Sequence, residues 1–270
     1  MRRMGWRVAG VALAACVLLS GCAQKSETIM LPGNVPLEMV WIPAGSFTMG
    51  SPDTEQDRNV SEGPQHTVEL NGFWIGKYEL TKRQWTAVMG TEPWTGHPHV
   101  LDSPESPAVW VSWDDVRDFV AGLCVLTGKT FELPSEAQWE FACRAGTTTR
   151  FYWGDDPGVT VISDYAWWIV NAESAGQKYA HISGQKLPNA LGLYDMSGNV
   201  VEWCEDDWHA DYVGVPTGDL PWVDSPRSDG RVVRGGSWNG PSGNCRSADR
   251  GYLTPDLRYE FLGFRVVRTP

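Results

Sequence analysis

The stretch Gly192-Leu-Tyr-Asp-Met-Ser-Gly-Asn-Val-Val-Glu-Trp203 decides how this chain is expected to fold. Small and polar residues mix with large apolar ones too irregularly for a helix or a strand. Asp195 offers a carboxylate, Gly198 can adopt the positive φ that lets backbone carbonyls converge, and Asn199 tolerates a left-handed turn. A carboxylate among converging carbonyls is what a hard cation such as calcium prefers. From the residues alone, a tight turn that satisfies buried backbone is the simpler interpretation, and a calcium loop is the alternative.

The amino-acid composition predicts a loop-rich domain rather than a helical bundle. The 270 residues include 15 Trp, 29 Gly and 18 Pro, and large aromatic side chains can anchor loops that Gly and Pro shape. The length allows one large domain or two small ones with ample core. Because the net charge of -11 repels phosphate, we expect no nucleic-acid partner.

Residues 1–21 are expected to be a targeting segment and not part of the fold. Three arginines precede an apolar run at 8–19, which is too short for a typical membrane span. The run leads into Leu19-Ser-Gly-Cys22, which resembles a bacterial lipobox, so Cys22 is expected to be diacylated and to become the new N-terminus. A secretory signal cleaved near Gly21 is the alternative interpretation.

The lipoprotein interpretation predicts a location in the bacterial cell envelope. The protein would contact the membrane only through the lipid on Cys22, and its domain would face the periplasm or the cell surface. Ala23 after the cysteine favours the outer membrane in a Gram-negative cell. Residues 22–37, which include two prolines and a glycine, are interpreted as a tether, and residues 38–270 as the folded domain.

Local patterns predict short strands and three short helices. Alternating apolar residues indicate strands within 39–49 and over 65–70. Each helix begins at a capping box, in which a Ser or Thr and the Gln or Asp three residues later satisfy N–H groups, and ends at a glycine. The helices are expected over 81–90, 112–128 and 135–146. The segments 51–63, 147–191 and 208–230 are expected to be loops.

Several charged groups have both a chemical and a plain structural interpretation. Glu136 and Glu140 lie four residues apart on one helix face and could act as an acid–base pair, but we expect a solvated or arginine-paired face. The acids Glu205–Asp207 could hold a cation, but we expect a solvated loop. Forked arginine donors are expected to tie loops to buried carboxylates and carbonyls near the C-terminus. These arginines are Arg246, Arg250, Arg258 and Arg265.

The pattern as a whole resembles the formylglycine-generating enzyme family, also called sulfatase-modifying factors. The stretch Gly192–Trp203 resembles the family signature GLYDMxGNVWEW, with Val201 at the place of the first Trp. Four further blocks resemble family motifs in the same order. They begin at Met39, Gly63, Pro107 and Arg231, and the resemblance covers residues 38–268. It implies a single α+β domain with little regular secondary structure, related to C-type lectin-like domains.

The resemblance implies calcium as a cofactor. In the family, the signature loop binds calcium through one side chain and three backbone carbonyls. The corresponding ligands here are the side chain of Asp195 and the carbonyls of Met196, Gly198 and Val200. Asn171 and Ala172 match the start of a second calcium loop, but its later carboxylate has no counterpart between Ser174 and Tyr179, so that match is incomplete.

The resemblance also implies a place for catalysis. The family's enzymes oxidise a sulfatase cysteine to formylglycine with oxygen and copper(I), held by two cysteines five positions apart, and thiolates suit copper(I). Counted from Gly235–Trp238, these positions are Gly240 and Cys245, so one thiol is missing. Counted back from the arginines that follow, Cys245 falls outside the pair. Cys245 and Ser237 are the candidate catalytic residues, and copper would need another soft ligand such as Cys204.

Cys245 has a second interpretation as half of a disulfide. From the residues alone, Cys124, Cys143, Cys204 and Cys245 allow three full pairings in an oxidising compartment. In the family, a cysteine at the position of Cys143 forms a disulfide to the C-terminal block, so the resemblance implies a Cys143–Cys245 bridge. This bridge would close a loop of about 100 residues, stabilise the fold by roughly 2–5 kcal/mol and leave no thiol in the catalytic loop.

Three functions remain open from these patterns. The favoured one is a non-catalytic, lipid-anchored envelope protein that binds an envelope protein or a glycan, because the copper cysteine pair is incomplete. The first alternative is a copper-dependent oxidase of the formylglycine-generating type that acts on a protein cysteine in sulfatase maturation. The second is a diversified ligand-binding surface lipoprotein. Calcium is the expected cofactor, and copper is expected only if the protein is catalytic.

Overall fold

The computed structural model describes residues 24–270. The expected signal peptide and Cys22 lie outside the described residues. Within 24–270 there is no helix with the length and apolarity needed to cross a membrane. In chain order the elements are β1 Ser26–Leu31, β2 Val35–Ile42, β3 Gly45–Met49, η1 Val60–Glu62, β4 His66–Leu70, β5 Phe73–Gly76, α1 Lys82–Met89, α2 Trp113–Thr127, β6 Phe131–Glu132, α3 Glu136–Arg144, α4 Ile162–Tyr165, η2 Glu173–Ala175, β7 Val201–Asp207, β8 Arg231–Arg234, η3 Ser242–Cys245, β9 Arg250–Leu253, β10 Leu262–Gly263 and β11 Val267–Arg268.

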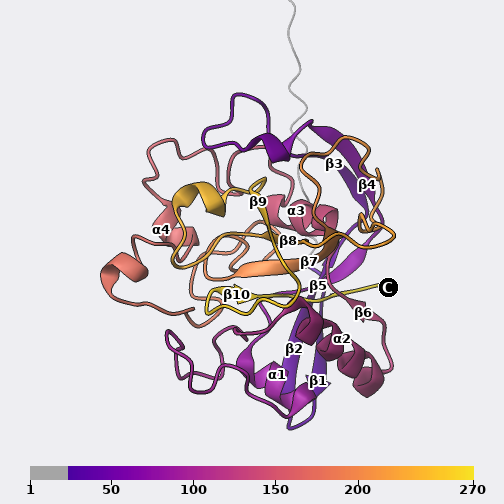
Figure 1. Ribbon diagram of the computed structural model, residues 1–270, viewed down its shortest axis with the longest axis vertical. Coiled ribbons are helices and arrows are strands. Elements are labelled where there is room, and N and C mark those ends of the chain that lie inside the picture. The colour runs from indigo at the N-terminus through magenta and orange to yellow at the C-terminus, as the bar shows by residue number, and fades with distance from the viewer. Residues whose placement is uncertain (1–23) are drawn as a thin grey trace, which may run out of the picture.

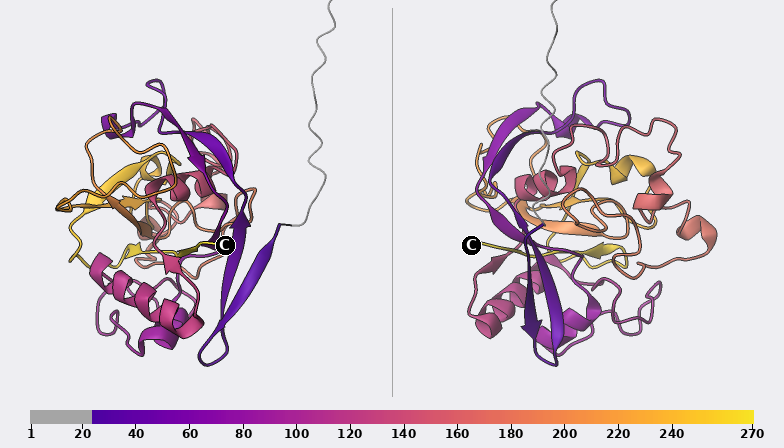
Figure 2. Two further views of the ribbon diagram at one scale, coloured as in Figure 1. Left: turned by 90° about the vertical axis from the view of Figure 1, so that its right-hand side faces the viewer. Right: turned by 180° about the vertical axis from the view of Figure 1, so that it is seen from behind.

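Within residues 24–270, three small sheets form the framework (Figures 1 and 2). The largest has the order β1-β2-β5-β11-β6, and all its neighbouring pairs are antiparallel. The second has the order β10-β7-β8-β9, with β10 parallel to β7, and β3 pairs with β4. In Figure 1, α1 and α2 lie together at the end of the molecule that holds β1 and β2, whereas β7, β8 and α3 lie near its centre. The predicted fold class, a single α+β domain with much irregular chain, is confirmed.

The chain joins the fold earlier than predicted, because the segment interpreted as a tether, residues 22–37, contains β1 and the start of β2. β1 pairs with β2 along its whole length, and its side chains Ile29 and Leu31 are buried. The tether prediction is therefore wrong from the start of β1 onward. The Pro and Gly that indicated a linker belong to a hairpin turn, in which Gly33 and Asn34 have φ of 76° and 60°, as tight hairpin turns require.

The three predicted helices form where their capping boxes place them. The side chains of Thr81, Ser112 and Ser135 each accept a hydrogen bond from the backbone N–H three residues later. The Gln or Asp side chain at that later position accepts the backbone N–H of the capping residue in return. α1 and α2 end at their predicted glycines. The end of α3 differs slightly, because Ala145 adopts the left-handed conformation with φ of 49°, one residue before Gly146.

Buried tryptophans tie the irregular chain to the core, as the composition predicted. Trp139 on α3 and Trp203 on β7 are fully buried. The indole N–H of Trp139 donates to Glu202 Oε2 at 2.8 Å, and that of Trp203 donates to the carbonyl of Val111 at 3.3 Å. Because each indole finds an acceptor, its large apolar ring is buried without an unsatisfied donor.

The acids Glu205–Asp207 lie in strand β7, so the prediction of a solvated loop is wrong. Asp206 and Asp207 are only 5% and 1% exposed. Asp206 accepts two backbone N–H groups at 2.7 and 2.8 Å. Asp207 pairs with Arg227 and Arg231 at 2.9 and 2.8 Å. The partners of Asp206 lie 70 and 16 residues away in the chain, and Arg227 lies 20 residues after Asp207, so no local pattern revealed that the acids are buried.

Candidate functional site

A cavity of about 370 Å³ lies beside the loop from Ser237 to Arg250, here called loop 237–250. β8 leads into this loop through Gly235 and Gly236, with φ of 98° and 73°. A side chain on Gly236 would lie 2.7 Å from the carbonyl oxygen of Asn244, so only glycine lets the loop close on itself. The cavity is lined by Asn59, Val201, Val233, Arg234, Gly236, Ser237, Asn239, Gly240, Asn244, Asp249, Arg250, Gly251 and Phe261.

Amide and hydroxyl groups form the polar part of the wall. Ser237 Oγ donates to Asn239 Oδ1 at 2.7 Å. Asn59 and Asn244 each donate their NH₂ group to a carboxylate oxygen of Asp249 at 3.1 Å, and burial raises the pKa of Asp249 to about 6. The lining residues include no His or Lys that could activate Ser237 as a nucleophile. The wall therefore suits hydrogen bonding to a ligand.

Cys245 lies in the core and does not line the cavity. Its side chain is fully buried in a cluster with Phe151, Ile162 and Ala166. Burial raises the pKa of its thiol to about 12, and Asp249 adds to the effect. Because the thiolate is the reactive form of cysteine, this placement makes the side chain inert. Of the two sequence candidates, the structure thus places only Ser237 at the cavity.

The cysteines do not assemble a copper(I) site. Cys124, Cys143, Cys204 and Cys245 are free thiols, so the implied Cys143–Cys245 bridge is not formed in this structure, and the Cys143 thiol donates to the carbonyl of Met196 at 3.5 Å. Cys204 lies in a different core cluster from Cys245. Residues 24–270 hold no group of three or more His, Cys, Asp or Glu side chains placed to bind a metal ion. Loop 237–250 itself holds a single thiol, Cys245, and so lacks the second thiolate of the implied copper(I) pair.

Arginine–carboxylate pairs support the cavity from the protein interior. Glu140 pairs with Arg144 at 2.8 Å and also with Arg234, so the arginine-paired face predicted for this helix is confirmed. Three of the four predicted C-terminal arginines bind both oxygens of a buried carboxylate, which is the strongest ion-pair geometry, and the fourth lies at the surface. The four pairs are Arg246–Glu62, Arg250–Glu136, Arg265–Glu202 and, at the surface, Arg258–Asp115.

The Asp195 loop is a tight turn that leaves one buried oxygen unsatisfied. Asp195 and Asn199 have φ of 54° and 62°, and a side chain on Gly198 would lie 2.2 Å from the carbonyl oxygen of Trp167. Asp195 Oδ2 accepts the N–H of Gly184 at 2.6 Å, whereas Oδ1 is buried and has no hydrogen-bond partner among residues 24–270. A buried carboxylate oxygen without a donor is costly, and a bound cation would remove that cost.

The charges around Asp195 also favour a cation. Burial raises the pKa of Asp195 to about 6, with Glu202 adding to the effect and Arg265 opposing it. Burial and the charge of Asp195 raise the pKa of Glu79 well above its usual value, although Asn199 donates to Glu79 at 2.6 Å. The buried carboxyl groups of Glu79, Asp195 and Glu202 thus lie around the one guanidinium of Arg265. Together with the orphaned Oδ1, this charge excess favours a cation beside Asp195, whereas the carbonyl of Met196, a further predicted ligand, accepts the Cys143 thiol.

The second predicted calcium loop gains no support from the geometry. Asn171 Oδ1 accepts the N–H of Trp168, and its amide donates to the carbonyl of Ala166, both at 2.9 Å. The carbonyl of Ala172 accepts two backbone N–H groups from the residues that follow. Both groups are used by the turn itself, so they are not arranged around a cation.

Two residues of the cavity wall escaped the sequence interpretation. Asn59 belongs to the segment 51–63, which was interpreted only as a surface loop. Asp249 lies between two arginines that were assigned structural roles. The hydrogen bond between them joins positions 190 residues apart. No local pattern marks either residue, because only the fold brings them together.

Comparison with known proteins matches residues 28–270 to the family model described as Sulfatase-modifying factor enzyme 1-like domain. The chain is 28% identical to the formylglycine-generating enzyme of Thermomonospora curvata, covering 88% of this chain and 96% of that protein. It is 25% identical to the chaperone protein LppX of Paenibacillus barcinonensis, covering 95% and 96%. The structure of PvdO from Pseudomonas aeruginosa matches with a TM-score of 0.79 and 34% identity, covering 87% and 95%.

Proposed function

Because the chain belongs to the sulfatase-modifying factor enzyme 1-like family, we propose that it is a non-catalytic, lipid-anchored binding member of that family in the bacterial cell envelope. Its ligand would lie in the cavity beside loop 237–250. One observation carries the proposal: the single thiol of that loop, Cys245, is buried away from the cavity. The chemistry of the family's oxidases needs two accessible thiolates at this place, and the cavity offers amides and a hydroxyl instead.

The wall of the cavity favours a polypeptide as the ligand. Asn59, Asn239 and Asn244 present side-chain amides, each with donors and an acceptor that match those of a peptide group. Val233 and Phe261 supply apolar surface in the same cavity. We therefore propose an extended segment of an envelope protein as the ligand. The similarity to a protein named as a chaperone supports this class of ligand.

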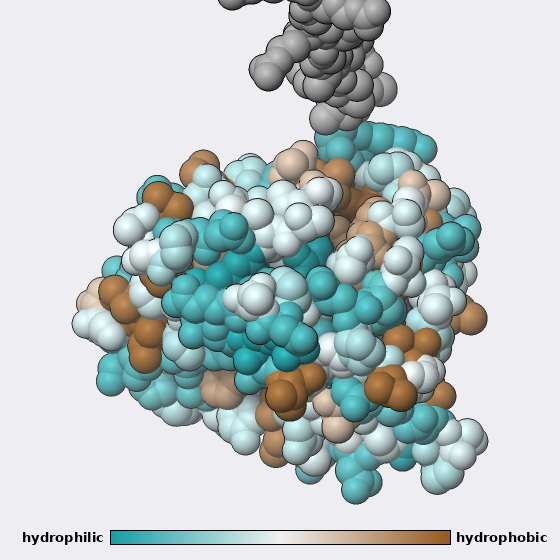
Figure 3. All heavy atoms as spheres, turned by 90° about the horizontal axis from the view of Figure 1, so that it is seen from above, coloured by the Kyte–Doolittle hydropathy of each residue, from teal (hydrophilic) through white to brown (hydrophobic). Residues whose placement is uncertain are grey.

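The start of β1 fits an anchor at Cys22. β1 begins at Ser26, so an extended chain of four residues, at roughly 3.3–3.6 Å each, would hold the sheet within about 15 Å of the lipid. The face shown in Figure 3 is mainly hydrophilic or intermediate in hydropathy, with several apolar patches between. We also propose that calcium binds at Asp195 and stabilises the loop.

Binding is tested with an unfolded polypeptide, reduced and alkylated lactalbumin, followed by fluorescence anisotropy in calcium-containing buffer. We expect binding that Asn244→Ala weakens and that the matched control Asn71→Ala, an exposed asparagine outside the cavity, leaves unchanged. Equal affinity in both variants would reject the cavity as the site. Binding of a chitin oligosaccharide in place of the polypeptide would move the proposal to a glycan.

Catalysis is the second candidate, since relatives named formylglycine-generating enzyme match nearly the whole chain. It is tested by offering the protein a Cys-x-Pro-x-Arg peptide with copper(I), calcium and oxygen, and by following the peptide cysteine with mass spectrometry. We expect no aldehyde. Aldehyde formation that Cys245→Ser abolishes would overturn the binding proposal and make Cys245 the next residue to study.

A further inference from the structure

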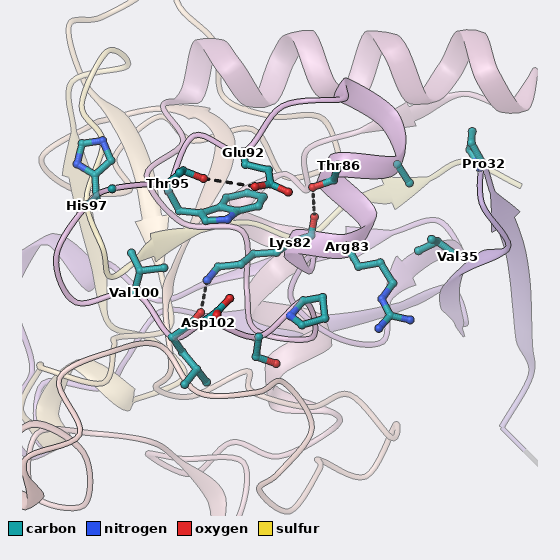
Figure 4. A pocket seen from close by; sticks show the side chains of 16 residues that line it. Pro32, Val35, Lys82, Arg83, Thr86, Glu92, Thr95, His97, Val100 and Asp102 are labelled. Carbon is teal, nitrogen blue, oxygen red and sulfur yellow. Dashed lines mark hydrogen bonds between the residues drawn. The ribbon is translucent and has the colours of Figure 1, made fainter.

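A second, larger cavity of about 710 Å³ shares no lining residue with the first (Figure 4). The turn between β1 and β2, helix α1 and the segment from Glu92 to Pro104 enclose it. Cavities of roughly 300–1,000 Å³ are typical of small-molecule sites, which are mainly apolar with a few placed polar groups. The proposed function leaves this cavity unused.

Lys82 provides the buried polar group of the cavity. Although it carries a charge, Lys82 is only 5% exposed. Its Nζ donates to the carbonyl oxygen of Leu101 at 2.5 Å and lies 5.5 Å from the ring centre of Trp94. Figure 4 shows the side chain reaching from α1 across the cavity to this carbonyl. An ammonium has three N–H donors, and this contact uses one of them.

Within the part of the chain that the structure describes, the ammonium of Lys82 has no buried counter-ion. The carboxylates that act on it, Asp102 and Glu92, do so only through space and lie exposed at the rim. Arg83, also at the rim, is already paired with Glu105 at 2.5 Å. Burial lowers the pKa of Lys82 to about 8, because a buried ammonium is poorly solvated. A buried charge is costly unless it is paired, and a ligand can supply the partner.

The remaining walls suit an apolar body. Val35, Ala87 and Val100 line the cavity and are all partly exposed, so their apolar surface is open to a ligand. We propose that this cavity binds a small amphipathic monocarboxylic acid. The carboxylate pairs with Lys82, and the hydrocarbon chain lies against the apolar walls. A second negative charge on the ligand is disfavoured, because Glu92 and Asp102 stand at the rim.

The test uses octanoate with two matched ligands, neutral octanamide and cationic octylamine, in titration calorimetry. The full chain carries Cys22→Ser so that no detergent is needed. We expect octanoate to bind about tenfold or more tightly than either of the others, since a charge-assisted hydrogen bond is lost with each. Lys82→Met should weaken octanoate binding by a similar factor, whereas the matched control Lys178→Met, an exposed lysine elsewhere, should not.

Two measurements separate loss of the charge from loss of the fold. Octanamide should bind Lys82→Met as well as it binds the unchanged cavity, and Lys82→Arg should retain the preference for octanoate. Equal affinities for the three ligands, absence of octanoate binding, or unchanged octanoate binding to Lys82→Met would each overturn the proposal. Polypeptide binding at loop 237–250 is independent of all these outcomes.

Discussion

Iodoacetamide added to the folded protein at pH 8 should modify Cys124 and leave Cys245 intact. Cys124 is partly exposed, whereas Cys245 is fully buried. With a pKa of about 12, about one Cys245 thiol in ten thousand is ionised at pH 8, against roughly a quarter of ordinary cysteines. Because the thiolate is the reacting form, the rate should fall by more than about a thousandfold, even before burial excludes the reagent.

The assay is mass spectrometry of the modified cysteine peptides under three conditions: folded, unfolded, and unfolded with reductant. Buried free thiols at Cys143 and Cys245 would react as soon as the chain unfolds. A Cys143–Cys245 disulfide would keep both unmodified until reductant is added. Rapid modification of Cys245 in the folded protein, at a rate near that of Cys124, would refute the reasoning and restore Cys245 as a catalytic candidate. Cys124→Ser confirms which peptide carries the fast reaction.

Four further predictions follow from the buried charges and the anchor. Burial raises the pKa of Asp206 to about 7, above its unfolded value, so its contribution to stability is present at low pH and is lost as the pH rises through 7. The free energy of unfolding of Asp206→Asn, measured in urea, should therefore rise by about 2–3 kcal/mol relative to that of the wild type between pH 5 and pH 8. A difference in unfolding free energy that does not depend on pH would contradict this assignment. A calcium chelator should lower the melting temperature of the wild type but not of Asp195→Ala, and equal sensitivity of the two would leave only the turn interpretation. Arg250→Met should cost about 3–5 kcal/mol because it removes the guanidinium that binds both oxygens of the buried Glu136, whereas Arg258→Met at the surface should cost at most about 1 kcal/mol, and similar losses would show that burial is not the cause. Cys22→Ser should release the protein from membrane fractions, and continued membrane association would argue against lipidation.

Signals that lie within a few residues predicted much of the fold. The capping boxes at Thr81, Ser112 and Ser135 place all three helices, because both hydrogen-bonding partners lie within one turn. The alternation of polar and apolar residues over His66–Leu70 predicts β4, because successive side chains of a strand point to opposite faces of the sheet. The irregular stretch Gly192–Trp203 predicts a turn with a carboxylate, and the structure forms one around Asp195. Its last three residues, which were expected to be neither helix nor strand, begin β7 instead.

The tertiary structure alone decided which side chains are buried and which residues far apart in the sequence pair with each other. The hairpin of β1 looked like a linker, because its value as a strand depends on its pairing with β2. Asp207 looked solvated, because its partner Arg227 lies 20 residues away. The cavity wall joins Asn59 to Asp249 across 190 positions. The burial of a charge and the reactivity of a thiol depend on neighbouring residues that come together only when the chain folds. Because these neighbours lie far away in the sequence, the local sequence does not reveal them.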